Sequence, residues 1–255
     1  MTKDPRVDDF DALHTRLKLE GRIVTRTALH IGSGGDTDVV NLPVQKTVHG
    51  YPVIPGSSLK GVVRSTIEGI LRAAGNDHLR TCDPFSDDAC GEHDDRKGPL
   101  KDHCAVCRLF GSHLVASHVR FSDARMLDES GSPPIEKRDG VSIDRDLRVA
   151  VPKRKYDLEV VSPGTEFFLE ILVQNPEAWS LGLLITGLDQ IADGFTAIGG
   201  FTSRGLGRIG IEWTSLTRTT AARLLAGKRD PEPLVMEEEF ATWRGALGLR
   251  AEGKS

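Results

Sequence analysis

The sequence has few aromatic residues and no long apolar segment. Aromatic side chains make up 5% of its 255 residues, so we do not expect nucleic-acid bases to stack on an aromatic sheet surface. No apolar run approaches the roughly 20 residues that span a bilayer, and the acidic N-terminus lacks the pattern of a signal peptide. These absences predict a cytoplasmic protein that does not contact a membrane.

Common nucleotide-binding motifs are missing as well. The chain has no Gly-Lys-Ser/Thr sequence of a P-loop. Residues 205–210 fit Gly-x-Gly-x-x-Gly by letter, but a strand pattern follows them, whereas a dinucleotide-binding turn opens a helix. The net charge of −4 argues against a uniformly basic nucleic-acid binder. Residues 137–155 nevertheless carry an excess of lysine and arginine that could contact phosphates.

The order of the predicted elements indicates an α+β fold. Apolar and polar residues alternate over 17–25, 118–124 and 165–173, which is typical of half-buried strands. Helical spacing follows over 58–74 and again from about Asn175. This split βαβ order predicts a ferredoxin-like core, similar to an RNA-recognition motif (RRM).

We predict a single domain over residues 1–255. Its core would comprise residues 17–75, 114–128 and 158–213. A cysteine-rich insert (76–113) and a basic, protruding β-hairpin or thumb (129–157) interrupt this core, and a helical segment (214–255) follows it.

The first predicted helix begins with hydroxyl residues and a lysine. Ser57 or Ser58 is a candidate N-cap, and the helix should end near Gly75. Lys60 and every fourth residue after it, as far as Arg72, are expected on the solvent face. A helix N-terminus beside a lysine is an anion site, although a well-capped surface helix would have the same pattern.

Two glycine-rich segments lie far from this helix in the sequence. One follows the first strand at residues 29–38, and the other spans residues 198–208. Glycines expose backbone N–H groups, and the guanidinium groups of Arg204 and Arg208 suit phosphate. Both segments are therefore candidate phosphate-binding turns.

All four cysteines lie between Cys82 and Cys107. The Cys104-x-x-Cys107 spacing lets two thiolates bind one ion, and Cys82 and Cys90 can complete a tetrahedral zinc site. His93 or His103 could replace one of these sulfurs. A cytoplasmic protein rarely forms disulfides, so we expect a structural Zn²⁺ that has no open coordination position.

Four segments, in this order, resemble the repeat-associated mysterious protein (RAMP) superfamily, specifically the backbone subunit of type III CRISPR effector complexes. They are Leu29-His-Ile-Gly-Ser-Gly34, Val39-Val-Asn-Leu-Pro-Val-Gln-Lys46, Ile54-Pro-Gly-Ser-Ser-Leu-Lys-Gly61 and Gly199-Gly-Phe-Thr-Ser-Arg-Gly-Leu-Gly-Arg208. Residues 138–145 and 156–159 also look like that family's mid-chain hairpin. The resemblance covers roughly residues 17–213, and some family members carry a zinc in the cysteine-rich region.

The resemblance implies an RNA-binding subunit for antiviral defence. Its expected partners are a CRISPR guide RNA, a complementary target RNA, other copies of itself in a head-to-tail filament, and other type III effector subunits. The basic hairpin would reach across the guide–target duplex and could wedge apolar residues between base pairs. The candidate RNA-binding residues are His30, Ser57, Ser58, Lys60, Arg64, Arg138, Arg145, Arg148, Lys153, Arg154, Lys155, Arg204 and Arg208.

The chain departs from the family pattern at the position implied to be catalytic. The family's aspartate lies two residues before a Pro-Val pair, and its implied role is target-RNA cleavage with Mg²⁺ or Mn²⁺; this chain has Asn41 at that position. Asparagine cannot act as a base and binds hard cations weakly, so we expect cleavage to be weak or absent. The alternative is a metal-dependent endoribonuclease that uses Asp36 or Asp38. His30 as the acid–base residue of a guide-processing endonuclease, an activity of RAMP relatives elsewhere in CRISPR systems, competes with a structural role for that histidine. A third hypothesis is a solitary metal-dependent RNA processor.

Overall fold

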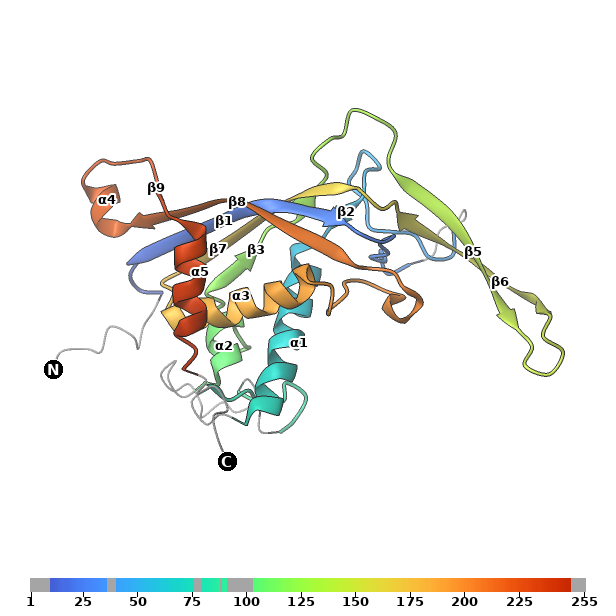
Figure 1. Ribbon diagram of the computed structural model, residues 1–255, viewed down its shortest axis with the longest axis horizontal. Coiled ribbons are helices and arrows are strands. Elements are labelled where there is room, and N and C mark those ends of the chain that lie inside the picture. Colours follow the sequence, from blue (N-terminus) through green and yellow to red (C-terminus); the bar gives the residue numbers. More distant parts are fainter. Residues whose placement is uncertain (1–9, 36–39, 76–78, 88, 91–102, 249–255) are drawn as a thin grey trace.

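The computed structural model describes residues 10–35, 40–75, 79–87, 89–90 and 103–248, with backbone alone at 152–154 (Figure 1). Three predicted site residues, Asp36, Asp38 and His93, lie outside the described residues, as do the side chains of Lys153 and Arg154. No helix in the described part of the chain is long and apolar enough to cross a membrane.

A five-stranded antiparallel sheet with strand order β3-β7-β1-β8-β9 forms the centre of the molecule. Its strands are β1 (Thr15–Thr25), β3 (Val119–Phe121), β7 (Glu166–Gln174), β8 (Ile209–Thr220) and β9 (Glu232–Pro233). β1 pairs along its whole length with both β7 and β8. The alternation predicted for 17–25 and 165–173 is confirmed, because every second side chain of these strands is buried.

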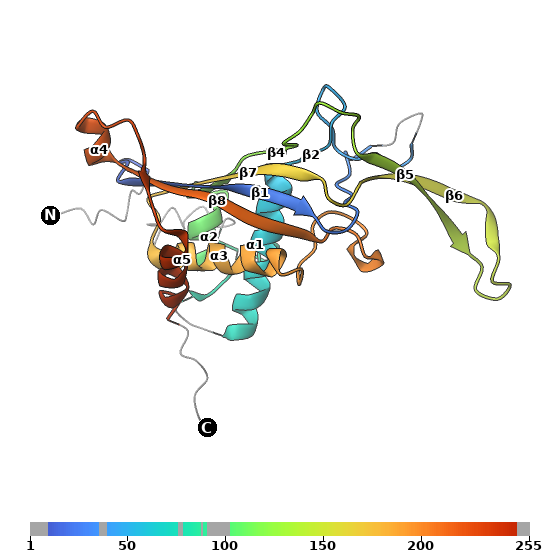
Figure 2. The ribbon, with the colours of Figure 1, turned by 45° about the horizontal axis from the view of Figure 1, so that its top comes forward.

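The larger helices lie on one face of this sheet (Figures 1 and 2). They are α1 (Gly56–Ala74), α2 (Ala105–Phe110), α3 (Ala178–Ala192) and α5 (Met236–Gly245), while the short α4 (Ala221–Leu225) follows the end of β8. Leu19 and Ile23 of β1 are fully buried in the core together with Val63 and Ile67 of α1. On the other face of β1, the Arg22 side chain forms ion pairs with carboxylates of β7 and β8.

The start of α1 differs from the prediction. The helix begins at Gly56 with Pro55 at the N-cap position, and neither Ser57 nor Ser58 caps it. Instead, the backbone N–H of Gly56 donates to Asp123 Oδ1 at 2.8 Å. The short antiparallel pair β2 (Val53–Ile54) and β4 (Ala124–Arg125) brings this distant carboxylate to the helix end. The end of the helix at Gly75, which is in the left-handed region, is as predicted.

One side of α1 was expected to face solvent but is largely covered. Glu68 is buried, with 7% of its surface exposed, and Arg64 is half-buried. The cause is the segment that includes α2 and Gly111, which packs against this side and accepts a hydrogen bond from Arg64 at Gly111 O (3.1 Å). The pattern of α1 alone could not reveal this second packing surface.

A two-stranded hairpin extends away from the sheet (Figure 1). Its strands are β5 (Ile135–Ile143) and β6 (Ala150–Val161), paired antiparallel with an irregularity near Val141. The apolar side chains near its tip are 50–74% exposed: Val141, Ile143, Leu147 and Val149.

Two glycines of α1 provide a matched test of this packing. A Cβ at Gly56 would lie 2.2 Å from Phe121 O, whereas a Cβ at Gly61 would meet no atom within 4 Å. We expect Gly56→Ala to lower the free energy of unfolding by about 1–3 kcal/mol, since overpacking against backbone forces a shift. Gly61→Ala should raise it by about 0.5–1 kcal/mol through helix propensity.

Chemical denaturation followed by circular dichroism measures both values. The close approach of α1 to β3 would be contradicted if the two alanine variants changed stability in the same direction.

Candidate functional site at the hairpin base

Segments that are distant in the sequence meet where the hairpin leaves the sheet. Leu29 and Val161 exchange backbone hydrogen bonds of 3.0 and 2.7 Å. Leu42 forms a parallel bridge with Leu158. We call this region, built from residues 28–32, 40–46, 156–161 and 198–208, the hairpin-base site. The glycine segments predicted from the sequence are thus adjacent to each other and to the hairpin.

The glycines of the second segment allow backbones to approach closely. Gly199 has a φ of +80°, and a Cβ there would lie 2.2 Å from His30 O. Gly207 has a φ of +89°, and a Cβ there would lie 2.1 Å from Ile198 O. The N–H of Gly200 donates to His30 O at 2.8 Å. These N–H groups and carbonyls bind each other, so the idea that this segment exposes most of its N–H groups to a phosphate needs correction.

His30 lies beneath this glycine segment, with only 5% of its surface exposed. Its Nδ1 is 2.8 Å from the carbonyl oxygen of Glu159. Because a carbonyl only accepts, Nδ1 carries the proton in this bond. The Phe201 ring packs edge-on at 5.3 Å between centroids. This environment fits a structural histidine better than an exposed acid–base residue.

Asn41 and Asp157 bind each other reciprocally. The backbone N–H of Asn41 donates to Asp157 Oδ1 at 2.8 Å, and the backbone N–H of Asp157 donates to Asn41 Oδ1 at 3.1 Å. Lys137 also forms an ion pair with Asp157. The hydrogen bond from the backbone N–H of Asn41 is the main cause that holds the pKa of Asp157 below its ordinary value, and the ammonium group of Lys137 is the second cause. At the position of the implied catalytic carboxylate, the side-chain oxygen is therefore engaged by backbone.

Glu159 holds the same loop two residues further along β6. Its carboxylate accepts from Val44 N at 3.1 Å and binds Lys46 Nζ at 2.7 Å. Residues two apart on a strand share a face, so Asp157 and Glu159 together fix residues 40–46. Sequence reasoning did not single out either carboxylate; the only available signal was their spacing within residues 156–159.

The two arginines of the glycine segment remain on the surface. Arg204 donates to the hydroxyl of Tyr156, and its guanidinium lies 5.3 Å from the Phe201 ring centroid. A guanidinium has five N–H donors, so this one can still bind an anion. Arg208 is exposed and forms no ion pair with any described residue. Both guanidinium groups are therefore accessible, and their role as RNA contacts stays a prediction.

The basic residues of the hairpin are only partly free. Arg138 pairs with Glu136, and Lys155 pairs with Asp139 at 2.9 Å. Arg145 and Arg148 are exposed near the tip, close to the apolar side chains named above. Asp144 and Asp146 lie in the same segment, so the tip presents two arginines and two carboxylates with no net charge.

The predicted residues of α1 are not part of the hairpin-base site. Ser57 and Lys60 line a cavity beside β3, and Ser58 is half-buried. Arg64 is directed at the cysteines, with Nη2 3.7 Å from Cys107 Sγ. The segment that includes α2 partly covers Arg64, and its role as an RNA contact stays a prediction.

The four cysteines form one cluster beside α1 and α2. The Sγ atoms of Cys82, Cys90, Cys104 and Cys107 all lie within 4.8 Å of one another. Cys82 Sγ is 3.6 Å from the sulfurs of both Cys104 and Cys107. A tetrahedral zinc with Zn–S bonds of about 2.3 Å places sulfurs about 3.8 Å apart, so this donor set fits a metal ion.

The environment of the cluster already favours a thiolate. Hydrogen bonds from Cys107, with burial opposing them, lower the pKa of Cys104 to about 4. His103 is buried, but it is not among the ligand atoms of this cluster. Its predicted role as a substitute ligand is therefore not supported by the described residues.

The fold and the site define a mixed α and β protein with an antiparallel sheet, in which glycine-rich turns and a hairpin base form one polar edge. A family model described as "RAMP superfamily" matches residues 22–210, so the chain belongs to the RAMP superfamily. The resemblance inferred from the glycine motifs is thereby confirmed.

Three relatives of this chain carry the name "CRISPR system Cms endoribonuclease Csm3". The protein of Methanothermobacter thermautotrophicus is 27% identical over 75% of this chain and 81% of its own length. Those of Methanocaldococcus jannaschii and Enterococcus italicus are 27% and 26% identical, each over 77% of this chain, and over 79% and 90% of their own lengths. The likeness therefore extends over most of each protein.

The pKa of Asp157 predicts how the hairpin-base site responds to acid. Because the folded pKa lies below the ordinary value of about 3.9, the Asn41–Asp157 bond is intact above that value and is lost as the pH falls through the lower folded pKa. We expect the amide proton of Asn41 to shift with a midpoint below about 3.9, measured by NMR.

Two substitutions test the cause of this shift. Asp157→Asn should abolish the transition, and Lys137→Gln should move its midpoint upward. A midpoint at or above the ordinary value in the natural chain would show that the carboxylate does not hold Asn41.

Proposed function

We propose that this chain is a guide-RNA-binding backbone subunit of a type III CRISPR effector complex. The observation that carries the proposal is the hairpin-base site, where three of the four segments that resemble the RAMP superfamily converge beside a protruding hairpin. The names of the Csm3 relatives support the same system. Copies would assemble head-to-tail along the guide, since a heterologous interface that does not close gives an open filament.

The architecture supports this role. The strand order β3-β7-β1-β8, with α1 and α3 on one face, fits the proposed ferredoxin-like core. Arg204 and Arg208 would contact guide phosphates at the hairpin base. Arg145 and the apolar tip of the hairpin would lie across the guide–target duplex. Such contacts read backbone shape and leave sequence recognition to base pairing, as in other RNA-guided systems.

Cleavage of the target by this chain is proposed to be weak or absent. Asn41 is neutral, and its side-chain oxygen is engaged by the Asp157 N–H. The neighbouring carboxylates, Asp157 and Glu159, bind lysines and backbone N–H groups. The second candidate function is a metal-dependent endoribonuclease that uses Asp36 or Asp38, and the word endoribonuclease in the relatives' names favours it.

We also propose a structural Zn²⁺ held by the four cysteines. When bound, zinc would link the segment around Cys82 to α2. Four thiolates on one Zn²⁺ carry a net charge of −2, and Arg64 would offset part of it through its contact with Cys107. Arg64 would thus be a positioning residue of the metal site.

The metal site predicts different effects for two arginines of α1. Arg64 and Arg72 both pair with Glu68, but among these two only Arg64 contacts Cys107 and Gly111. We expect one zinc per chain, and about 10–100-fold weaker zinc binding in Arg64→Gln, the usual effect of removing an outer contact. Elemental analysis and release of zinc to a chromogenic chelator measure these effects.

Arg72→Gln serves as the matched control and should retain zinc as the natural chain does. Purified chain that takes up no zinc would refute the metal site, and equal zinc release from both variants would refute the role of Arg64.

The proposed function is tested with the guide complex assembled from this chain or from Asn41→Asp. Aspartate can still accept from the Asp157 N–H, and it adds a second carboxylate beside Asp157 that can bind a divalent cation. With Mg²⁺ or Mn²⁺, we expect both complexes to bind labelled complementary RNA. Only Asn41→Asp should cut it at regular spacing, at least about 10-fold faster, since acid–base groups typically contribute 10²–10⁴-fold.

Asn41→Ala is the control, because it removes the side-chain contact without adding charge. Equal cutting by the natural chain and Asn41→Asp, abolished by Asp36→Asn or Asp38→Asn, would establish the endoribonuclease alternative instead. Failure of the natural chain to bind guide RNA would refute the function itself.

A further inference from the structure

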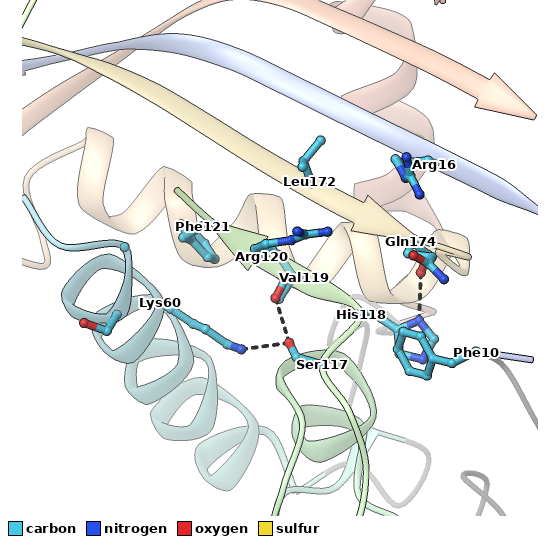
Figure 3. A pocket seen from close by; sticks show the side chains of 12 residues that line it. Phe10, Arg16, Lys60, Ser117, His118, Val119, Arg120, Phe121, Leu172 and Gln174 are labelled. Carbon is cyan, nitrogen blue, oxygen red and sulfur yellow. Dashed lines mark hydrogen bonds between the residues drawn. The ribbon is translucent and has the colours of Figure 1, made fainter. Parts of the chain in front are cut away.

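A cavity of about 430 Å³ lies between the start of α1 and the edge strand β3 (Figure 3). It shares no residue with the hairpin-base site. Its volume falls within the usual range of small-molecule sites, about 300–1,000 Å³. Three cationic side chains line it, namely Arg16, Lys60 and Arg120, and no carboxylate does.

Lys60 forms one end of the cavity. Its Nζ donates to Ser117 Oγ at 2.8 Å, and no described carboxylate pairs with it. An ammonium has three N–H donors, so two remain for a ligand. Burial is the main cause that lowers the pKa of Lys60, and the positive charge of the nearby Arg64 is the second cause. A bound anion would offset this cost of keeping a half-buried cation.

The two arginines extend the positive charge along the sheet. Strand register places Arg120 beside Leu172 of β7, and Gln174 of β7 beside Arg16 of β1. Neither arginine forms an ion pair with any residue that the structure describes. Figure 3 shows Lys60, Arg120 and Arg16 spaced along the cavity rather than gathered at one point. Such spacing suits an elongated ligand that carries an anionic group at one end and further hydrogen-bond acceptors along its length.

The remaining walls are apolar or aromatic. Phe10 packs on the His118 ring with 4.6 Å between centroids, and Phe121 and Leu172 lie further along. Asp123, which caps Gly56 at 2.8 Å, partly neutralises the helix end but does not line the cavity. Cations beside aromatic and aliphatic walls match a ligand that joins phosphate to a flat, weakly polar ring.

We propose that this cavity binds a nucleoside phosphate, with its phosphate and sugar oxygens spread along Lys60, Arg120 and Arg16 and the base against the apolar wall. The nucleotide could be free or part of an RNA strand, and in the second case the inference rests on the proposed function. It adds to that function a phosphate-binding surface on the β3 edge that includes two arginines unnoticed in the sequence.

The test uses the double variant Arg16→Gln, Arg120→Gln in the full chain. Both side chains are exposed, so the fold should be kept, which circular dichroism verifies. The probes are AMP, inorganic phosphate and a labelled single-stranded RNA 10-mer, titrated at two salt concentrations. We expect the variant to bind AMP or RNA at least about 10-fold more weakly, and its RNA salt slope to fall by about 2, one per lost phosphate contact.

The matched control is Arg72→Gln. It removes one positive charge from the same helix as Lys60, twelve residues or about 18 Å further along, and it should leave both affinities unchanged. A loss of AMP affinity alone would identify a free nucleotide as the ligand, and a loss of RNA affinity alone would identify an RNA strand.

Unchanged affinity for both probes in the double variant, or an equal loss in Arg72→Gln, would overturn the proposal. A natural chain that binds AMP through these arginines but binds no RNA would keep the cavity site and refute the RNA function instead. The experiment can therefore refute the cavity site without refuting the RNA function, and the reverse.

Discussion

The site depends on one short contact, the bridge between Leu42 and Leu158 that fastens residues 40–46 to the base of the hairpin. An isolated parallel bridge is weak, and here two carboxylates of β6 reinforce it. Asp157 binds Asn41, and Glu159 binds Val44 and Lys46. On its other side the same loop is held to the segment that follows His30, where Gly32 bridges Val44 and the Gln45 N–H donates to Ile31 O at 2.8 Å. Residues 40–46 are therefore fixed between the first glycine segment and the hairpin.

The same carboxylates show how charges are arranged at the hairpin-base site of this acidic chain. The carboxylates of Asp157 and Glu159 bind lysines and backbone N–H groups, so they present no unpaired negative charge at the hairpin-base site. On the open face of the sheet, the carboxylates of Glu166 and Glu212 likewise form ion pairs with the Arg22 guanidinium. Net charge therefore says little about this surface, because the arrangement of charges decides what faces outward.

The sequence predicted those features that depend on local pattern. Alternation located β1 and β7, and Gly75 marked the end of α1. Spacing grouped Cys104 with Cys107. Prediction from the sequence failed where the contacting residue lies far along the chain. Asp123 caps α1, α2 covers Arg64, and Asp157 engages Asn41. Such contacts depend on tertiary packing, which no window of a single sequence contains.

The central place of β1 has a consequence for synthesis of the chain. β1 is made first, but its two partners, β7 and β8, lie at residues 166–174 and 209–220. At roughly 5–20 residues per second, this strand waits on the order of 10 s with unpaired edges and an exposed apolar face. The molecule thus belongs among proteins whose long-range pairings make folding slow and vulnerable to aggregation. Chaperone binding to the nascent β1 segment would be the natural safeguard.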